Sequence, residues 1–174
     1  MEEKIKLLGF SNVREMPVSE IAFEPSLLDL CKQNSCGNYG RCYTCPPLVG
    51  KPEQLVAEAK QYQKAYVFQK IYSLEDSFDI EGMNKGQKDF QKLVEDVNEL
   101  FLATRQPYLL LTAGGCRLCR ICGAVTGEPC RFPEKAHPSL EAYAINVSSV
   151  AAACGLKYIN GQNTVTYFGM VLID

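Results

Sequence analysis

Three cysteines at successive three-residue intervals are the feature of this 174-residue chain that points most directly to chemistry. They are Cys116, Cys119 and Cys122, and Cys130 follows after seven intervening residues. A tetrahedral zinc ion is usually bound by two separated Cys-x2-Cys pairs, whereas each iron of a cubane needs a thiolate of its own. Three closely spaced cysteines with a fourth nearby therefore favour an iron-sulfur cluster.

The nearest template for this group is the bacterial ferredoxin run C-x2-C-x2-C-x3-C-P. The chain departs from it in the last interval, and the proline is displaced to Pro133. In two-cluster ferredoxins the fourth cysteine of such a run binds the other cluster. Two arrangements of Cys130 therefore fit the sequence, one closing the cluster of its own group and one reaching a second cluster.

A second group of four cysteines lies upstream, in the segment CKQNSCGNYGRCYTCPP: Cys31, Cys36, Cys42 and Cys45. Gly37 and Gly40 allow the backbone to bend, and Pro46 holds the residue before it extended. The spacing suits zinc, a cubane with four ligands, or a cubane with three ligands and one open iron. We interpret it as a cubane, so the chain is predicted to carry two 4Fe-4S clusters with four cysteine ligands each.

The ninth cysteine, Cys154, follows the segment SLEAYAINVSSVAAA, where apolar residues recur at three- and four-residue steps. This pattern predicts that Cys154 lies on the buried face of a helix. Disulfides are disfavoured because the start, MEEKIKLLGF, has no long apolar core of a signal peptide, and because 174 residues can bury a core without staples. We therefore expect a cytoplasmic protein, in which cysteine clusters usually serve metals or catalysis.

The composition argues against several classes of function. The net charge is only −2 and the basic residues are scattered, so no footprint for nucleic acid is visible. The apolar stretches are too short to span a bilayer, and we expect no membrane association. No linker, repeat or low-complexity tract interrupts the chain, which predicts a single iron-sulfur domain over residues 1–174.

The elements that position the cysteines follow from the spacing of apolar residues. Helices are predicted over residues 52–64, along the stripe from Phe90 to Phe101 that ends before Pro107, and from about Ser139. Strands are predicted over residues 65–72, 108–113, 156–159 and 164–173, with a turn at 161–163 that makes the last two an antiparallel hairpin. Alternating helices and strands indicate an α/β fold: a partly parallel mixed sheet flanked by helices, with cysteine-rich cluster-binding loops.

The loop from Gly114 to Pro138 leaves the end of the strand 108–113, which we expect to be central and buried on both faces. In open α/β sheets, ligands gather beyond the carboxyl ends of the parallel strands. The loop is also too long for a plain connector. We therefore expect a cofactor to organise it, with both cysteine groups near each other on one side of the sheet.

Several motifs of the chain resemble a known family. These are CGNYG at residues 36–40, CPP at 45–47, AGGC at 113–116 with the cysteines that follow, and CRFP at 130–133. They are similar to the small cysteine-rich "predicted metal-binding proteins" of anaerobic bacteria and archaea, and the similarity spans most of the chain. The resemblance implies a metal site without an established reaction.

The position of Cys42 need not be cysteine in similar proteins. The resemblance therefore implies a second possibility, in which Cys31, Cys36 and Cys45 bind the first cluster and leave one iron open. We expect the closed form, because four cysteines within fifteen residues are more often all used.

Three functions are compatible with these cysteines. The first is a low-potential electron-transfer protein with a redox protein partner, since a cube with four thiolates passes electrons only. The second is an enzyme that uses an open iron on a small substrate, for example a sulfur compound, because an open iron also acts as a Lewis acid. The third is a zinc-binding module for protein contacts. We favour the electron carrier.

Eight other residues near the cysteines are weaker candidates: Tyr39, Tyr43, Arg117, Arg120, Glu128, Arg131, His137 and Glu141. The only histidine could ligate or transfer a proton, but a surface or capping position is favoured. The arginines either hold an anionic partner, offset the charge of a cluster, or are simply solvated. The glutamates are interpreted as surface charge, and the tyrosines as packing beneath the cysteine loop.

Overall fold

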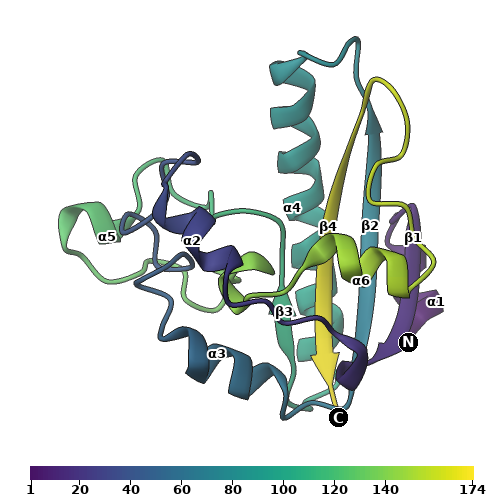
Figure 1. The fold of residues 1–174 in the computed structure, drawn as a ribbon, viewed down its shortest axis with the longest axis horizontal. Coiled ribbons are helices and arrows are strands. Elements are labelled where there is room, and N and C mark those ends of the chain that lie inside the picture. The colour runs from purple at the N-terminus through teal and green to yellow at the C-terminus, as the bar shows by residue number, and fades with distance from the viewer.

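A four-stranded antiparallel sheet is the centre of the fold in the computed structural model, which describes residues 1–174 (Figure 1). Its strands are β1 (Asn12–Pro17), β2 (Lys64–Ser73), β3 (Leu109–Leu111) and β4 (Thr164–Ile173). Their order across the sheet is β1-β2-β4-β3. The last strand along the chain is thus a central one, and β3 lies at an edge.

The helices are short except for one. They are α1 (Glu2–Leu7), α2 (Leu27–Lys32), α3 (Pro52–Ala59), α4 (Ile80–Leu102), α5 (Gly123–Thr126) and α6 (Val147–Ala153), with 3-10 turns η1 (Val18–Glu20) and η2 (Glu141–Tyr143). The long helix α4 begins where Asp79 Oδ1 accepts a hydrogen bond of 2.7 Å from the Gly82 amide. None of the helices combines the length and apolar character needed to cross a membrane.

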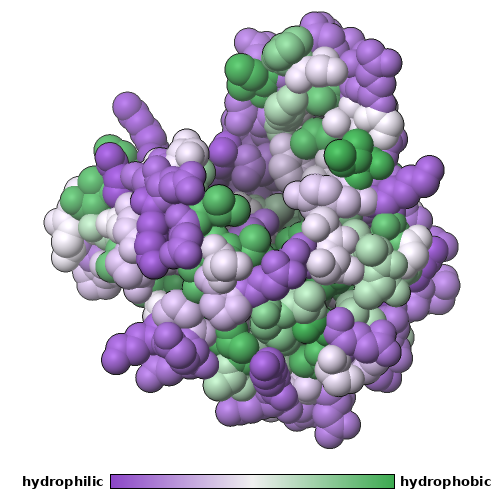
Figure 2. All heavy atoms as spheres, in the orientation of Figure 1, coloured by the Kyte–Doolittle hydropathy of each residue, from purple (hydrophilic) through white to green (hydrophobic).

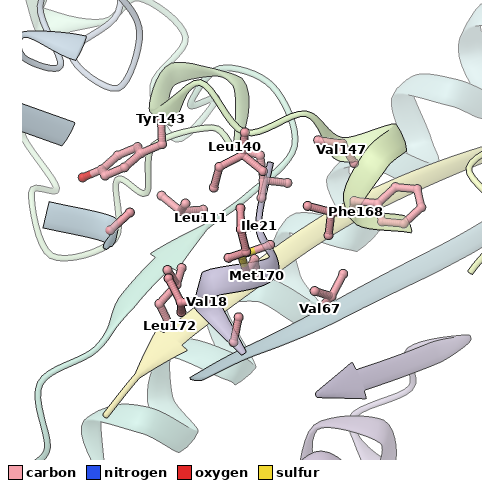
Figure 3. Close-up of a cluster of buried hydrophobic side chains, with 14 of the residues drawn as sticks. Val18, Ile21, Val67, Leu111, Leu140, Tyr143, Val147, Phe168, Met170 and Leu172 are labelled. Atoms are coloured by element: carbon pink, nitrogen blue, oxygen red, sulfur yellow. The ribbon is translucent and has the colours of Figure 1, made fainter. Parts of the chain in front are cut away.

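Both faces of the sheet are covered. On one face α4 packs its apolar stripe, including Phe90 and Val97, against Phe68 and Val171 of the central strands. On the other face α3, η2 and α6 cover alternate residues of the same strands, among them Met170 (Figure 3). Side chains therefore alternate between two apolar layers rather than between core and solvent.

The prediction of a partly parallel sheet is wrong, because every strand pair is antiparallel. The unit β2-α4-β3 is a crossover whose two strands point the same way, but β4 lies between them and pairs antiparallel with both. Long apolar runs are typical of parallel strands because such strands are usually covered on both faces. Here an antiparallel sheet is covered on both faces, so its strands have the same long apolar runs that parallel strands usually have.

Other elements were predicted with mixed success. The helix and strand that follow the first cysteine loop, α3 and β2, are confirmed, although α3 ends at Ala59 and not near residue 64; α4 and β4 are confirmed as well. Residues 156–159 are irregular backbone with a bend at 158–159 instead of a strand, so the final hairpin is absent. The helix expected from Ser139 is divided into η2 and α6 because Ala144 adopts a left-handed conformation, φ 57°. The short elements β1, α1 and α2 were not predicted.

Gly169 leaves room for the Phe68 ring, which packs in the apolar layer between the sheet and α4. It lies opposite Phe68 in the sheet, and a Cβ at this position would stand 2.2 Å from the Phe68 ring. That ring is fully buried, with the Phe10 ring 4.6 Å away and the Phe90 ring 6.4 Å away between centroids. The ring therefore has little room to move, and glycine is required by close packing.

Gly169→Ala should lower the free energy of unfolding by about 2–3 kcal/mol, because over-packing forces strained side chains and strand shifts. Chemical denaturation should show a lower midpoint with an unchanged slope. In a Phe68→Leu background, Gly169→Ala should lower the free energy of unfolding by less than it does in the wild type, because the ring that obstructs the added methyl group is gone. Equal losses in the two backgrounds would show that the ring is not the obstacle.

Candidate metal centre

Both cysteine groups lie in a lobe beside the β3 edge of the sheet, where α2 and α5 also lie (Figure 1). The second loop is closed at its base. The Thr112 amide donates to the Pro138 carbonyl at 2.9 Å, and the Leu140 amide donates to the Thr112 carbonyl at 3.1 Å. The loop therefore leaves and rejoins the scaffold at the carboxyl end of β3, although this strand is an edge strand and not the central one we expected.

The first cysteine segment is anchored to the same part of the scaffold. Phe23 forms an isolated antiparallel bridge with Ile145, and the Glu24 amide donates to the Ala144 carbonyl at 2.6 Å. The Asn146 side chain also donates to Glu24 Oε1 at 2.9 Å. Because residues 144–146 follow the second loop along the chain, both loops are supported by one short stretch.

The two groups are in direct contact through Thr44. Its hydroxyl is buried, accepts a hydrogen bond of 3.2 Å from the Cys116 amide, and lies 3.3 Å from Cys42 Sγ. Nearby, the Tyr43 hydroxyl donates to the Glu128 carbonyl at 2.7 Å. Tyr43 thus links the two loops rather than packing beneath its own. The expectation that the groups lie near each other is confirmed.

The second group surrounds a single small cavity of about 20 Å³, lined by Cys116, Cys119, Cys122 and Cys130. The first three of these thiols also line a larger cavity of about 410 Å³. Burial raises the pKa of Cys116 to about 11. The structure therefore brings the four predicted ligands of the second cluster together, with adjoining space beside three of them.

The first group is less uniform. Cys42 and Cys45 are 3% and 7% exposed, and the closeness of the two thiols lowers the pKa of Cys42 and raises that of Cys45. Cys31 lies half-buried in α2, and Cys36 is exposed. Burial, followed by the charges of Glu141 and Cys36, raises the pKa of Cys31. Cys42 lines the larger cavity with the second group, whereas Cys36 lies near Cys45.

The donors suit an iron-sulfur cluster in their chemistry. All eight are free thiols, but no three His, Cys, Asp or Glu side chains lie close enough together to hold a metal ion. The amides of residues 117–122 make no backbone hydrogen bonds. Those of Gly114 and Gly115 are also free, although Gly37 and Gly40 donate theirs to backbone carbonyls. Free amides beside sulfur are the donors that tune cluster potentials.

Gly115 lies where the two groups meet. A Cβ there would stand 3.2 Å from Cys45 Sγ and 2.9 Å from the Asn38 side chain. Gly123 also allows a close approach, within the second loop, because a Cβ at this position would meet the backbone carbonyls of Glu128 and Pro129. Neither close approach has a signal in the sequence, apart from the glycines themselves.

His137 is half-buried and is not the surface residue we expected. Its Nε2 atom and the Thr112 Oγ1 atom are both buried without a hydrogen-bond partner, and both residues line a cavity of about 30 Å³ with Cys116. That volume suits one water molecule with polar partners. Burial lowers the pKa of His137 to about 4.

Acid should therefore destabilise the protein through His137. Its pKa lies below the unfolded value near 6.5, so the unfolded chain binds the proton more tightly and stability falls as the pH decreases from about 6.5 to about 4. Over this range the wild type should lose up to about 3 kcal/mol more of its free energy of unfolding than His137→Leu does, because the variant has no imidazole to protonate. Thermal unfolding at each pH, with both proteins loaded identically, measures the difference. Parallel pH profiles would mean that His137 is not buried neutral.

Of the remaining candidates, Arg117 and Arg120 line the larger cavity of about 410 Å³. The others make contacts within the two loops or with the scaffold. Arg131 pairs with Glu128 and donates to the Ile121 carbonyl at 2.9 Å. Glu141 is half-buried and not a surface charge as interpreted, and this burial raises its pKa. Tyr39 uses its amide to bind Asn34 Oδ1 at 3.0 Å.

Cys154 lies far from both cysteine groups, on the core side of α6. Its sulfur is 3.3 Å from Met16 Sδ of β1, and its side chain packs on the apolar layer that covers one face of the sheet. The prediction that Cys154 lies on the buried face of a helix is confirmed only in part, because Cys154 is the C-cap of α6 and is half-buried.

An antiparallel α/β scaffold that carries eight thiols in two adjoining loops defines a cysteine-rich metal-binding class of protein. A family model described as "Predicted metal-binding protein (DUF2284)" matches residues 14–173, so the chain belongs to this family. The matched range includes both cysteine groups and all four strands except the first residues of β1. Searches of curated proteins and of solved structures gave no match.

Proposed function

We propose that this protein carries two 4Fe-4S clusters and transfers single electrons at low potential between a protein donor and acceptor. The observation that carries the proposal is the contact of the two cysteine groups through Thr44, since adjoining groups would place two clusters close enough for electron relay. Four thiols around one cavity and a series of unpaired amides support the identity of the second cluster.

Each part of the lobe has a role in this proposal. The second cluster would be held by Cys116, Cys119, Cys122 and Cys130, and the first by Cys31, Cys36, Cys42 and Cys45. A bound cubane supplies one-electron chemistry. The chain supplies burial, amide donors from Gly114 and Gly115, and the guanidinium of Arg131 beside Cys119. The free state of all nine cysteines supports a reducing, cytoplasmic setting.

A second candidate function is an enzyme with an open iron in the first cluster. The position of Cys42 favours it, because this thiol lines the cavity of the second group and leaves Cys31, Cys36 and Cys45 to bind the first cluster. An iron without a thiolate ligand can bind a small molecule and polarise it. The two candidates therefore differ in the role of one residue.

The decisive measurement is iron and inorganic sulfide per chain in anaerobically prepared protein, together with its electron paramagnetic resonance spectrum. The carrier predicts about eight of each and a reversible one-electron reduction. Zinc-saturated protein without sulfide after reconstitution would refute both cluster functions and support a zinc module. Cys42→Ser should perturb the first cluster in the closed form. An unchanged spectrum, together with a shift of the wild-type spectrum by cyanide, would favour the enzyme.

A further inference from the structure

Three arginines that no part of the proposed function uses meet at the larger cavity beside the cysteines. Arg41 comes from the first loop, and Arg117 and Arg120 come from the second. No aspartate or glutamate lines this cavity. The whole chain has a net charge of −2, so its overall composition does not explain why three guanidinium groups and no carboxylate line one cavity. The positive charge is local to this cavity.

These arginines are also poorly neutralised. Arg41 and Arg120 make no ion pair or side-chain hydrogen bond, and Arg117 has only one hydrogen bond, of 3.2 Å, to Asn84 Oδ1 of α4. By contrast, Arg131 on the same loop is paired with Glu128. Like charges that face one cavity repel each other, and an anion in that cavity would relieve the repulsion. Guanidinium groups bind carboxylate and sulfonate oxygens with charge-assisted hydrogen bonds.

The cavity also has an apolar side. Ile121 and Val125 line it and are 54% and 45% exposed, which is high for large aliphatic side chains. Asn38 adds a neutral amide to the lining. Figure 2 shows hydrophobic and hydrophilic residues side by side on this lobe, and a recess between it and α4.

We propose that this cavity binds a small organic acid, with its carboxylate or sulfonate on Arg41, Arg117 and Arg120 and its short hydrocarbon chain on Ile121 and Val125. The site goes beyond electron transfer, because it gives the cysteine lobe a ligand of defined chemistry. It would place that ligand beside Cys42 and the thiols of the second group, which line the same cavity.

The test is calorimetric titration of the anaerobically prepared protein with butanoate and with butane-1-sulfonate at low ionic strength. We expect saturable binding of both, and weaker binding of inorganic sulfate and of butan-1-ol, which each lack one of the two required features. Arg120→Gln should weaken binding at least about tenfold, since it removes one charge-assisted hydrogen bond. Arg41→Gln/Arg120→Gln should abolish it.

The matched control is Lys88→Gln, which removes an exposed and unpaired positive charge from α4. It should bind the two acids as the wild type does. Val125→Ser should weaken the binding of butanoate more than that of sulfate, which tests the apolar side independently of charge. Iron and sulfide are counted for every variant, so that loss of binding is separated from loss of a cluster.

Absence of saturable binding to the wild type would overturn the proposal, even if the arginine variants shifted a reduction potential, because the arginines would then only offset cluster charge. Equal affinity for sulfate and butane-1-sulfonate would overturn the apolar part. Binding by protein that contains zinc and no sulfide would uphold this site while refuting the electron-transfer function.

Discussion

Cys119→Ala should reduce the iron and sulfide of anaerobically reconstituted protein by about half, from about eight to about four of each per chain. Cys119 is the middle thiol of the second group and lines both cavities beside it. A cubane that loses one of its thiolates is exposed to solvent at that iron, so the second cluster should be lost or degraded. The first cluster should remain, because its cysteines come from another loop.

Cys154→Ala is the matched control, since it removes a thiol that packs on Met16 and lies at the end of α6. Its iron and sulfide should equal those of the wild type, with a small loss of stability from the missing sulfur. If Cys154→Ala alone removed four irons, the division of the cysteines into two groups of four would be wrong. Full iron content in Cys119→Ala would exclude this residue as a ligand.

Gly123→Ala should remove the second cluster without changing any thiol. A Cβ at residue 123 would stand 2.6 Å from the Glu128 carbonyl oxygen and 2.7 Å from that of Pro129. The Glu128 amide also donates to the Gly123 carbonyl at 2.9 Å, so the obstacle is backbone that is already held in place. The turn must open, and Cys130 would then move away from Cys122.

The expected result for Gly123→Ala is loss of about four irons per chain with an unchanged far-ultraviolet circular dichroism spectrum, because the turn lies outside the sheet. Gly127→Asn is the control in the same turn. Residue 127 has φ 75°, a Cβ there would meet no atom within 4 Å, and asparagine tolerates this conformation. This variant should keep its iron. Equal iron in both variants would show that closure of this turn is not needed.

The sequence was most informative about the site where spacing and chemistry coincide. The interval between Cys116, Cys119 and Cys122 indicated that these thiols lie close together, and they line one cavity. The position of Cys42 was not predictable, because its contact with the Cys116 segment depends on how two loops fold against each other. Thr44 was missed for the same reason, since a buried threonine that joins two loops has no local pattern.

The long elements of the fold were predicted, but several short elements and the topology were not. The apolar runs of β2 and β4 were long enough to identify both strands, and the stripe of α4 identified the helix. The order of the strands depends on contacts far apart along the chain, which periodicity does not record. His137 and Glu141 show the same limit, because their burial follows from the return of residues 138–140 to the end of β3.

The place of β4 between β2 and β3 has a consequence for how the protein is made. Both cysteine loops precede β4 along the chain, and β3 has no partner strand until β4 is synthesised. All eight thiols of the lobe therefore leave the ribosome before their scaffold can close. During that interval they are open to oxidation and to wrong disulfide pairing. Correct assembly thus requires that these thiols stay reduced until β4 has been synthesised.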